Sequence, residues 1–203
     1  MTITVNDEPV YTDVATVKTY LGLTGTQWDD EIADDIASAA RWIDQSCDQF
    51  FYETTTNQTR GYIPQNPGYC ITDPISQFVS LTAQDSVWTR DSDFMLEPLN
   101  NDLQGQPFTA IRTIARPFIF TQAQIPAGWA GFDGRVYVTA KFGWPAVPNQ
   151  IVQANKIQAA RYFHRKNAPL GVISFSNEVA ARMARADADA LALLEAFGLV
   201  SLF

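Results

Sequence analysis

Apolar residues at spacings of three and four predict a long helix in the first quarter of the chain. The stripe runs over about five turns and consists of Ile32, Ile36, Ala40, Ile43, Cys47 and Phe50. This spacing places all of its members on one side of an α-helix. Asp29, Asp30 and Glu31 precede or open the stripe, where the helix dipole favours negative charge. The pattern indicates an amphipathic helix that packs by one face.

A shorter helix is predicted just before this one. Asp13 is a favoured N-cap for the segment 14–21, and Gly22 suits the end of a helix. Thr26 and Asp29 have the spacing of a capping box. The chain therefore begins with a short helix, a loop and a long helix.

From about residue 57 the periodicity changes from helical to alternating. Several strand-like stretches, YCIT, ISQFVSLT, SVWTRDSDFMLEP and FTAIRTI, are separated by Gly and Pro. The clearest alternation lies in RVYVTAKF, in which every second residue is apolar: Val136, Val138, Ala140 and Phe142. Strict alternation is typical of a half-buried antiparallel strand. We interpret residues 57–142 as an inserted antiparallel β module.

An abrupt joint follows in the segment FGWPAVPNQIVQA, residues 142–154. Pro145 cannot donate a hydrogen bond to a sheet ladder, so the sheet has to stop there. Pro148 suits the first turn of a helix, where its missing N–H costs nothing. The joint thus returns the chain from strands to helices.

Apolar spacing then predicts one helix as far as about residue 166 and a last helix over residues 186–197. The expected fold class is α+β. A helical body of about four helices, residues 1–56 and 143–203, is interrupted by the β module of residues 57–142.

Charge is distributed unevenly along the chain. The net charge is −8, and residues 1–56 alone hold 11 acidic and 2 basic side chains. Tight binding to exposed nucleic acid requires Lys and Arg to neutralise phosphates, so this balance argues against it; DNA that passes without being gripped remains compatible with it. The acidic residues Asp30, Glu31, Asp34 and Asp35 predict either a solvated helix face or an inner or mating surface.

No catalytic or metal-binding set can be assembled from the residues. His164 is the only histidine, and Cys47 and Cys70 match no metal spacing and are expected to be reduced, partly buried thiols. Asp30 and Asp34 could hold a divalent cation, but a solvated acidic face is the favoured interpretation. We expect no cofactor, no metal and no enzymatic activity. The chain shows neither a membrane span nor a secretion signal, which favours the cytoplasm as the place of synthesis.

Two further features leave alternatives open. Trp88, Trp129 and Trp144 lie in or beside the β module, where they either fill the sheet core or form the sugar-stacking surface of a carbohydrate-binding module. The C-terminal segment LVSLF, residues 199–203, is predominantly apolar and either docks on its own chain or docks on a partner protein.

Three stretches together resemble the head–tail connector (adaptor) proteins of tailed bacteriophages. DVATVKTYLGLTGTQWDDEIADDIASAARWIDQSCDQFF is similar to the family's opening, with a short helix, a loop and a long helix. ITDPISQFVSLTAQDS and FMLEPLNNDLQGQPFTAI are similar to its inserted β section. VYVTAKFGWPAVPNQIVQANKIQAARYFHRKNAPLGVISFS is similar to its last strand, GWP joint and long helix. The likeness rests on the order and spacing of these stretches over most of the chain.

The resemblance implies a structural role in the neck of a virion that is assembled in the host cytoplasm. Such proteins form a ring, expected here to have twelve copies, that binds the portal protein on one face and the stopper or another neck protein on the other. DNA passes through the central channel. The resemblance also implies that the C-terminal region reaches the portal, through Leu194, Phe197, Leu199, Val200, Leu202 and Phe203. The acidic residues named above would face the channel or a neighbouring subunit. Another neck or tail-completion protein is the alternative within the same class.

Overall fold

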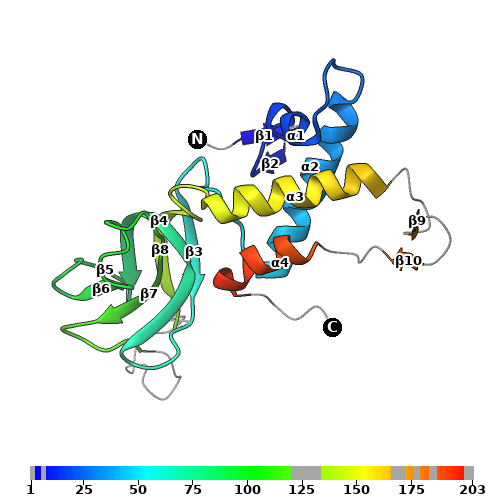
Figure 1. Ribbon diagram of the computed structural model, residues 1–203. Helices are drawn as coiled ribbons and strands as arrows, with labels where there is room; N and C mark the ends of the chain where they lie inside the picture. Colours follow the sequence, from blue (N-terminus) through cyan, green and yellow to red (C-terminus); the bar gives the residue numbers. More distant parts are fainter. Residues whose placement is uncertain are drawn as a thin grey trace. The chain divides into compact units, whose positions relative to one another are not determined.

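The computed structural model describes residues 3–5, 8–119, 134–165, 172–175, 179–182 and 187–198. The chain divides into two compact units, each built around its own core (Figure 1). Residues 1–51 and 147–203 form unit 1, and Tyr52–Ala146 form unit 2. Helices dominate unit 1 and an antiparallel sheet makes up unit 2, which confirms the predicted α+β class.

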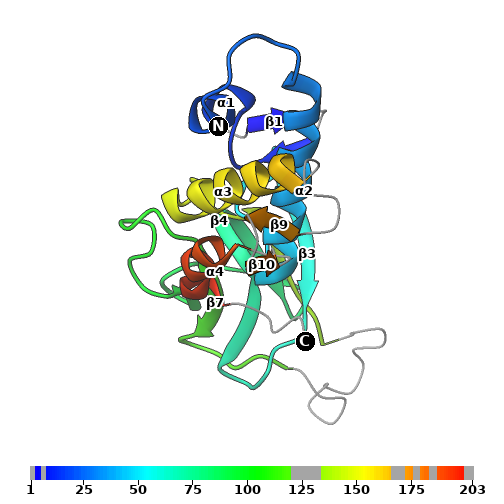
Figure 2. The same cartoon turned by 45° about the vertical axis from the view of Figure 1, so that its right-hand side comes forward.

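The described residues of unit 1 form four α-helices and two short hairpins. Its elements are β1 (Ile3–Val5), β2 (Glu8–Val10), α1 (Val14–Leu21), α2 (Asp29–Cys47), α3 (Asn149–Arg165), β9 (Val172–Phe175), β10 (Val179–Arg182), α4 (Ala188–Leu194) and the 3-10 turn η2 (Glu195–Phe197). The β1–β2 hairpin was not predicted, because three-residue strands are too short to show a period. Helix α3 lies between α1 and α4 in both ribbon views (Figures 1 and 2).

The predicted caps of α1 are confirmed, whereas the capping box of α2 is wrong. The Asp13 carboxylate accepts a hydrogen bond from the Thr16 backbone N–H at 2.7 Å, and Gly22 ends the helix in the left-handed conformation. Helix α2 instead begins after Trp28, which makes no side-chain capping bond. Its three first-turn acids take over the electrostatic part of the cap.

The predicted apolar stripe of α2 packs against α3. Ile32, Ile36 and Ile43 are fully buried, and the buried Asn155 of α3 donates its Nδ2–H to the Ile36 carbonyl at 3.1 Å. This contact fixes which side of α3 faces α2. Helix α3 ends at Arg165, within one residue of the predicted end.

The described residues of unit 2 form an antiparallel sheet of six strands. They are β3 (Gln58–Tyr62), β4 (Tyr69–Ala83), β5 (Ser86–Trp88), β6 (Phe94–Glu97), β7 (Phe108–Thr113) and β8 (Val136–Phe142). The order is β3-β8-β4-β7-β6, with β5 added on β4. Strand β3 lies in a stretch for which no strand was predicted, and β4 joins YCIT and ISQFVSLT, which we expected to be separate strands.

Strand β4 organises the sheet because its two halves have different partners. The first part pairs with β7, and the second pairs with β8 and β5. Register shifts interrupt the ladder between Ile71 and Ile75 and again between Phe78 and Ser80. Such bulges bend a strand and increase its twist, so one long strand curves around the core.

The core of unit 2 is made by the inward-facing side of these strands. Its buried members are Cys70, Ile75, Leu81, Ala83, Trp88, Phe94, Leu96, Phe108, Ile111, Phe118, Val136, Val138, Ala140 and Phe142. The four alternating residues of β8 that the sequence singled out are all among them, so the predicted alternation is confirmed.

Gly143 ends β8 at a point where no side chain fits. Its φ is +102°, and a Cβ built on it would lie 1.8 Å from the carbonyl oxygen of Tyr52. Its own N–H donates to the Pro74 carbonyl at 2.7 Å. The close approach of residues 52–54 to the end of β8 therefore requires a glycine here.

Candidate docking surfaces

The predicted acidic residues lie along the outer side of α2. Asp30 and Asp34 are exposed, whereas Glu31 and Asp35 are partly buried. One turn separates Asp30 from Asp34, and both lie opposite the buried isoleucine stripe, about half a turn around the helix. Asp29, at the start of the helix, accepts a 2.5 Å hydrogen bond from Lys18 Nζ. The structure thus brings Asp30 and Asp34 together on one side of the helix.

An open hollow lies on unit 1 beside α3. It has a volume of about 420 Å³ and is lined by Tyr20, Leu21, Ile157, Ala160, Arg161, His164 and Asp187. The residues from α3 follow the i, i+3, i+4, i+7 spacing of one helix face. Leucine, isoleucine and alanine form an apolar floor, and the charged and aromatic groups stand around it. The exposed Tyr20 ring carries the Lys156 ammonium 5.1 Å from its centre.

Asp187 joins the start of α4 to α3. Its carboxylate accepts a 2.7 Å hydrogen bond from Arg161 and also caps α4 through the Asp189 N–H. Its own backbone N–H donates to Gln158 Oε1 at 3.1 Å, and Gln158 is fully buried. No local sequence pattern predicts this set of contacts, because the partners of Asp187 lie more than twenty residues away.

The other end of α4 is held just as firmly, which changes the interpretation of the predicted docking residues. Leu194 is fully buried, and the Phe197 ring packs edge-on against Phe51 at 5.2 Å. The Phe197 carbonyl accepts a hydrogen bond from Gln49 Nε2 at 3.0 Å. Leu194 therefore belongs to the core of unit 1 and offers no surface to a partner while α4 stays docked. The remaining predicted docking residues lie outside the described residues: Leu199, Val200, Leu202 and Phe203.

A buried polar network secures Phe51, the last residue of the first segment of unit 1. The Tyr11 hydroxyl donates to the Asp44 carboxylate and accepts from the Phe51 N–H at 3.0 Å. Arg41 contacts the same carboxylate at 3.1 Å. Burial raises the pKa of Asp44, and the bonds from Tyr11 and Arg41 offset only part of that rise. The network fixes both the backbone and the ring of Phe51, on which Phe197 packs.

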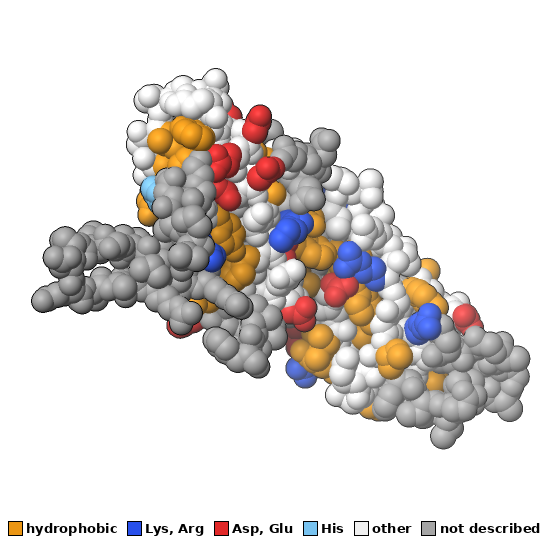
Figure 3. Space-filling model, turned by 90° about the vertical axis from the view of Figure 1, so that its right-hand side faces the viewer, with side chains coloured by type: hydrophobic (Ala, Val, Ile, Leu, Met, Phe, Trp, Pro, Cys, Tyr) orange, Lys and Arg blue, Asp and Glu red, His pale blue; other side chains and the backbone are white. Residues whose placement is uncertain are grey.

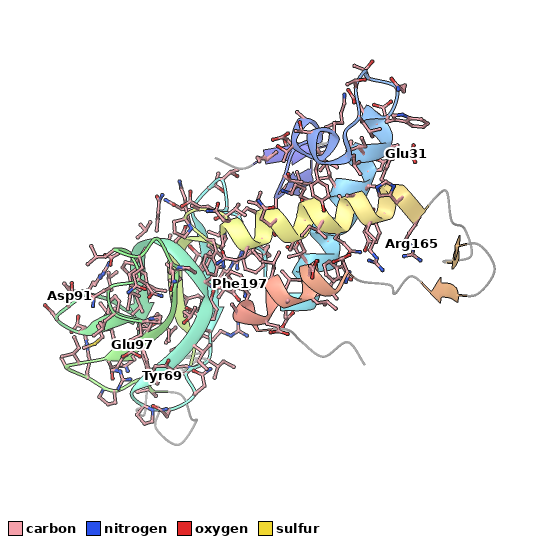
Figure 4. The ribbon with its side chains drawn as sticks, in the orientation of Figure 1. Glu31, Tyr69, Asp91, Glu97, Arg165 and Phe197 are labelled. Atoms are coloured by element: carbon pink, nitrogen blue, oxygen red, sulfur yellow. The ribbon has the colours of Figure 1, made fainter. Side chains whose placement is uncertain are left out.

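Four arginines of unit 2 are each held by an aromatic ring and a carboxylate. The pairs are Arg60 over Phe142 with Asp73, Arg90 over Phe108 with Asp91, Arg112 over Tyr69 with Glu97, and Arg116 over Trp88 with Asp93. Figure 4 labels Tyr69, Asp91 and Glu97 on this unit. A cation that is already paired contributes little to phosphate binding, because the carboxylate repels the phosphate. These arginines do not form a DNA-binding patch.

Trp88 cannot serve as a sugar-stacking platform. Only 2% of it is exposed, and its ring stacks on Phe118 at 5.2 Å. Trp144 is partly buried, and Trp129 lies outside the described residues. The core interpretation is therefore correct for Trp88, which removes one of the three rings on which the carbohydrate-binding alternative rested.

Within the described part of the chain, no cluster of three or more His, Cys, Asp or Glu side chains could hold a metal ion. His164 is exposed. Both cysteines are free and buried, and burial raises the pKa of Cys47 to about 11 and that of Cys70 to about 12. Among the helices described, none has the length and apolarity that crossing a membrane requires.

Comparison with known proteins identifies the fold only through solved structures. No protein-family model matches the chain, and no curated protein matches it either. The chain is similar to a protein of the neck of an empty gene transfer agent (GTA) particle computed with C6 symmetry, with 18% identity and a TM-score of 0.52. It is similar to one of the neck of the native particle computed with C12 symmetry, with 17% identity and a TM-score of 0.51. Both matches cover 94% of this chain and 90% of the other. At this level of identity the likeness shows a shared fold.

Proposed function

We propose that this chain is a structural neck protein of a tailed, phage-like particle, and specifically its head–tail connector (adaptor). The observation that carries the proposal is the nearly end-to-end match with a neck structure, at 94% of this chain and 90% of the other. A match over 94% of the chain has to include most of both units, so the likeness is not confined to one common motif. The adaptor role itself comes from the resemblance carried by the sequence around the GWP joint.

The proposed assembly is a ring of twelve copies that joins the portal protein to a stopper or other neck protein. Support for a ring comes from the C12 and C6 symmetries of the two neck structures that share the fold. A ring needs a head-to-tail contact, in which two different surfaces of each copy meet. Its working place is the neck of the virion, after assembly in the host cytoplasm.

DNA would pass through this ring without being gripped. Two features of the chain support the proposal: the net charge of −8, and the pairing of four arginines of unit 2 with carboxylates. An acidic wall repels phosphates, so a duplex can slide along it. The proposal also concerns the residues that line the channel. The outer side of α2 either faces the channel or forms the contact between copies.

The test is electron microscopy of the purified chain alone and mixed with its portal protein. We expect rings stacked on one face of the portal, with twelve copies by native mass spectrometry. Particles that contain only portal, with the chain remaining monomeric at every mixing ratio, would refute the adaptor role.

The C-terminal segment provides a second test that does not disturb the core. We propose that residues 199–203 attach the ring to the portal. Removing them should abolish attachment and leave the fold intact, because the contacts described for α4 and η2 are made by residues up to Gly198. Unchanged attachment would show that another surface carries the contact.

A further inference from the structure

The hollow on unit 1 has the composition of a protein-docking site. Hot spots of protein interfaces are enriched in Tyr, Trp and Arg, and they lie where apolar contacts are surrounded by polar groups. The exposed Tyr20 ring, the apolar floor with Ile157, and the Arg161–Asp187 ion pair have this arrangement. None of these groups is required to hold α3 against α2, since that contact uses the opposite side of α3.

The rim of the hollow is positively charged. Lys156 stands over Tyr20, and Arg165 lies at the end of α3, four residues after Arg161. Within the described residues, neither Lys156 nor Arg165 has a carboxylate within 4 Å, in contrast to the paired Arg161. A partner that carries carboxylates would therefore be attracted to this rim.

The hollow and the outer side of α2 lie on opposite sides of the α2–α3 pair. Asn155 faces α2, and Ile157 comes two residues later, about 200° around the helix. Asp30 and Asp34 point away from α3 in the same way, because they lie opposite the buried stripe of α2. In the upper part of Figure 3, acidic side chains gather to the right of the pale blue histidine.

We propose that the hollow is the docking site for a second copy of this chain, which places the first turns of its α2 there. Asp30 and Asp34 of one copy then meet Lys156 and Arg165 of the next. Two different surfaces on opposite sides of one unit give the head-to-tail contact that closes a ring. This inference rests on the proposed ring and names its interface.

A second copy is the partner that the charges favour. Residues 1–51 hold 10 acidic and 2 basic side chains, whereas residues 147–203 hold 4 acidic and 6 basic ones. Copies with a net charge of −8 repel one another unless opposite charges meet at their contact. The proposed contact supplies that match with side chains that already lie on the surface.

The test uses two variants of the full chain with reversed charges. One carries Asp30→Lys with Asp34→Lys, and the other carries Lys156→Glu with Arg165→Glu. In either variant alone, like charges meet at every contact, so the concentration at half-assembly should rise about tenfold or more. Sedimentation velocity and native mass spectrometry measure it, and circular dichroism verifies that both variants are folded.

An equimolar mixture of the two variants should assemble again. In an alternating ring, contacts between the two reversed surfaces alternate with contacts between the two unchanged surfaces, so every contact pairs opposite charges. The chain that carries all four substitutions should also assemble. A control with Asp102→Lys and Glu195→Lys raises the net charge as much as Asp30→Lys with Asp34→Lys does, but at exposed positions away from the contact, and it should assemble as the wild type does.

The outcomes separate this inference from the proposed function. Wild-type chains that form rings together with two reversed variants that form them equally well would refute the contact and leave the ring standing. Two impaired variants that are not rescued by mixing would also refute it. A wild-type chain that stays monomeric, alone and on its portal, would overturn both.

Discussion

Replacing Gly143 by alanine tests whether the joint between strand and helix depends on close backbone contact. The substitution adds one methyl group at a φ of +102°, where an L residue is strained by about 1 to 3 kcal/mol. The new Cβ would lie 1.8 Å from the Tyr52 carbonyl oxygen, so the backbone has to move by more than an ångström. That movement would weaken the Thr54 N–H bond to the Phe142 carbonyl at 2.8 Å and the Gly143 N–H bond to Pro74 at 2.7 Å.

Each of these buried bonds contributes about 1 kcal/mol. Together with the strain, the loss amounts to about 3 to 5 kcal/mol of the free energy of unfolding of unit 2. Urea denaturation, combined with hydrogen exchange of peptides from β4 and β8, measures the change in this unit separately from unit 1.

Two other glycines provide a control for the close approach. Gly22 and Gly105 also have positive φ values, 67° and 66°, but no atom lies within 4 Å of a Cβ built on them. Alanine at either position should cost only the backbone strain, about 1 kcal/mol. If alanine at Gly143 costs no more than alanine at Gly105, steric contact with Tyr52 is not what requires the glycine, and our account of the joint is wrong.

Four further predictions follow from the contacts described above. Leu194→Ala should reduce the free energy of unfolding of unit 1 by about 2 to 5 kcal/mol in urea denaturation, because the side chain is fully buried; a loss below about 1 kcal/mol would place Leu194 on the surface after all. Iodoacetamide at pH 8 should leave Cys47 and Cys70 unmodified until denaturant is added, since burial raises both pKa values and suppresses the thiolate; rapid labelling of the native chain, seen by mass spectrometry, would contradict this. Burial raises the pKa of Asp44 in the folded state, so the stabilisation from its neutral form is complete at low pH and is lost as pH rises through that value. Asp44→Asn should lack this pH dependence in urea titrations, and parallel curves for the two proteins would disprove the assignment. Gel-shift assays at low salt should show no retardation of duplex DNA by the chain, and a salt-dependent shift at micromolar concentration would refute the ungripped passage of DNA.

The parts of the fold that were predictable are those with a long, regular period. Helix α2 and strand β8 each bury one face. Every third or fourth residue of α2 and every second residue of β8 is therefore apolar. Strand β3 left no such mark, because Thr59 and Gly61 alternate with the half-buried Arg60 and Tyr62. These two side chains both contact Asp73 in the first half of β4, a partner that no local pattern reveals.

Docking residues were harder to predict because periodicity shows that a surface is covered without showing what covers it. The resemblance placed Leu194 among the portal-docking residues, whereas the structure buries its side chain in unit 1, where α4 packs on α2 and α3. The hollow was missed for the opposite reason. Its floor combines residues of α1 and α3 that lie more than 130 positions apart in the sequence. The α3 face that lines it mixes apolar and polar residues, Ile157, Ala160, Arg161 and His164, so it shows no clear apolar periodicity.

Salt dependence alone cannot decide whether charge complementarity closes the proposed ring. Added salt screens the attraction between Asp30 or Asp34 and the cationic rim, which weakens the contact. The same salt screens the repulsion between copies that each carry a charge of −8, which favours assembly. The two effects oppose one another and have a similar range of about 8 to 10 Å, so a flat salt response is compatible with either strong or weak complementarity. Charge reversal changes the short-range attraction between Asp30 or Asp34 and the cationic rim. Mixing the two variants restores the average charge of the copies. Only a specific head-to-tail contact loses assembly in the first experiment and regains it in the second.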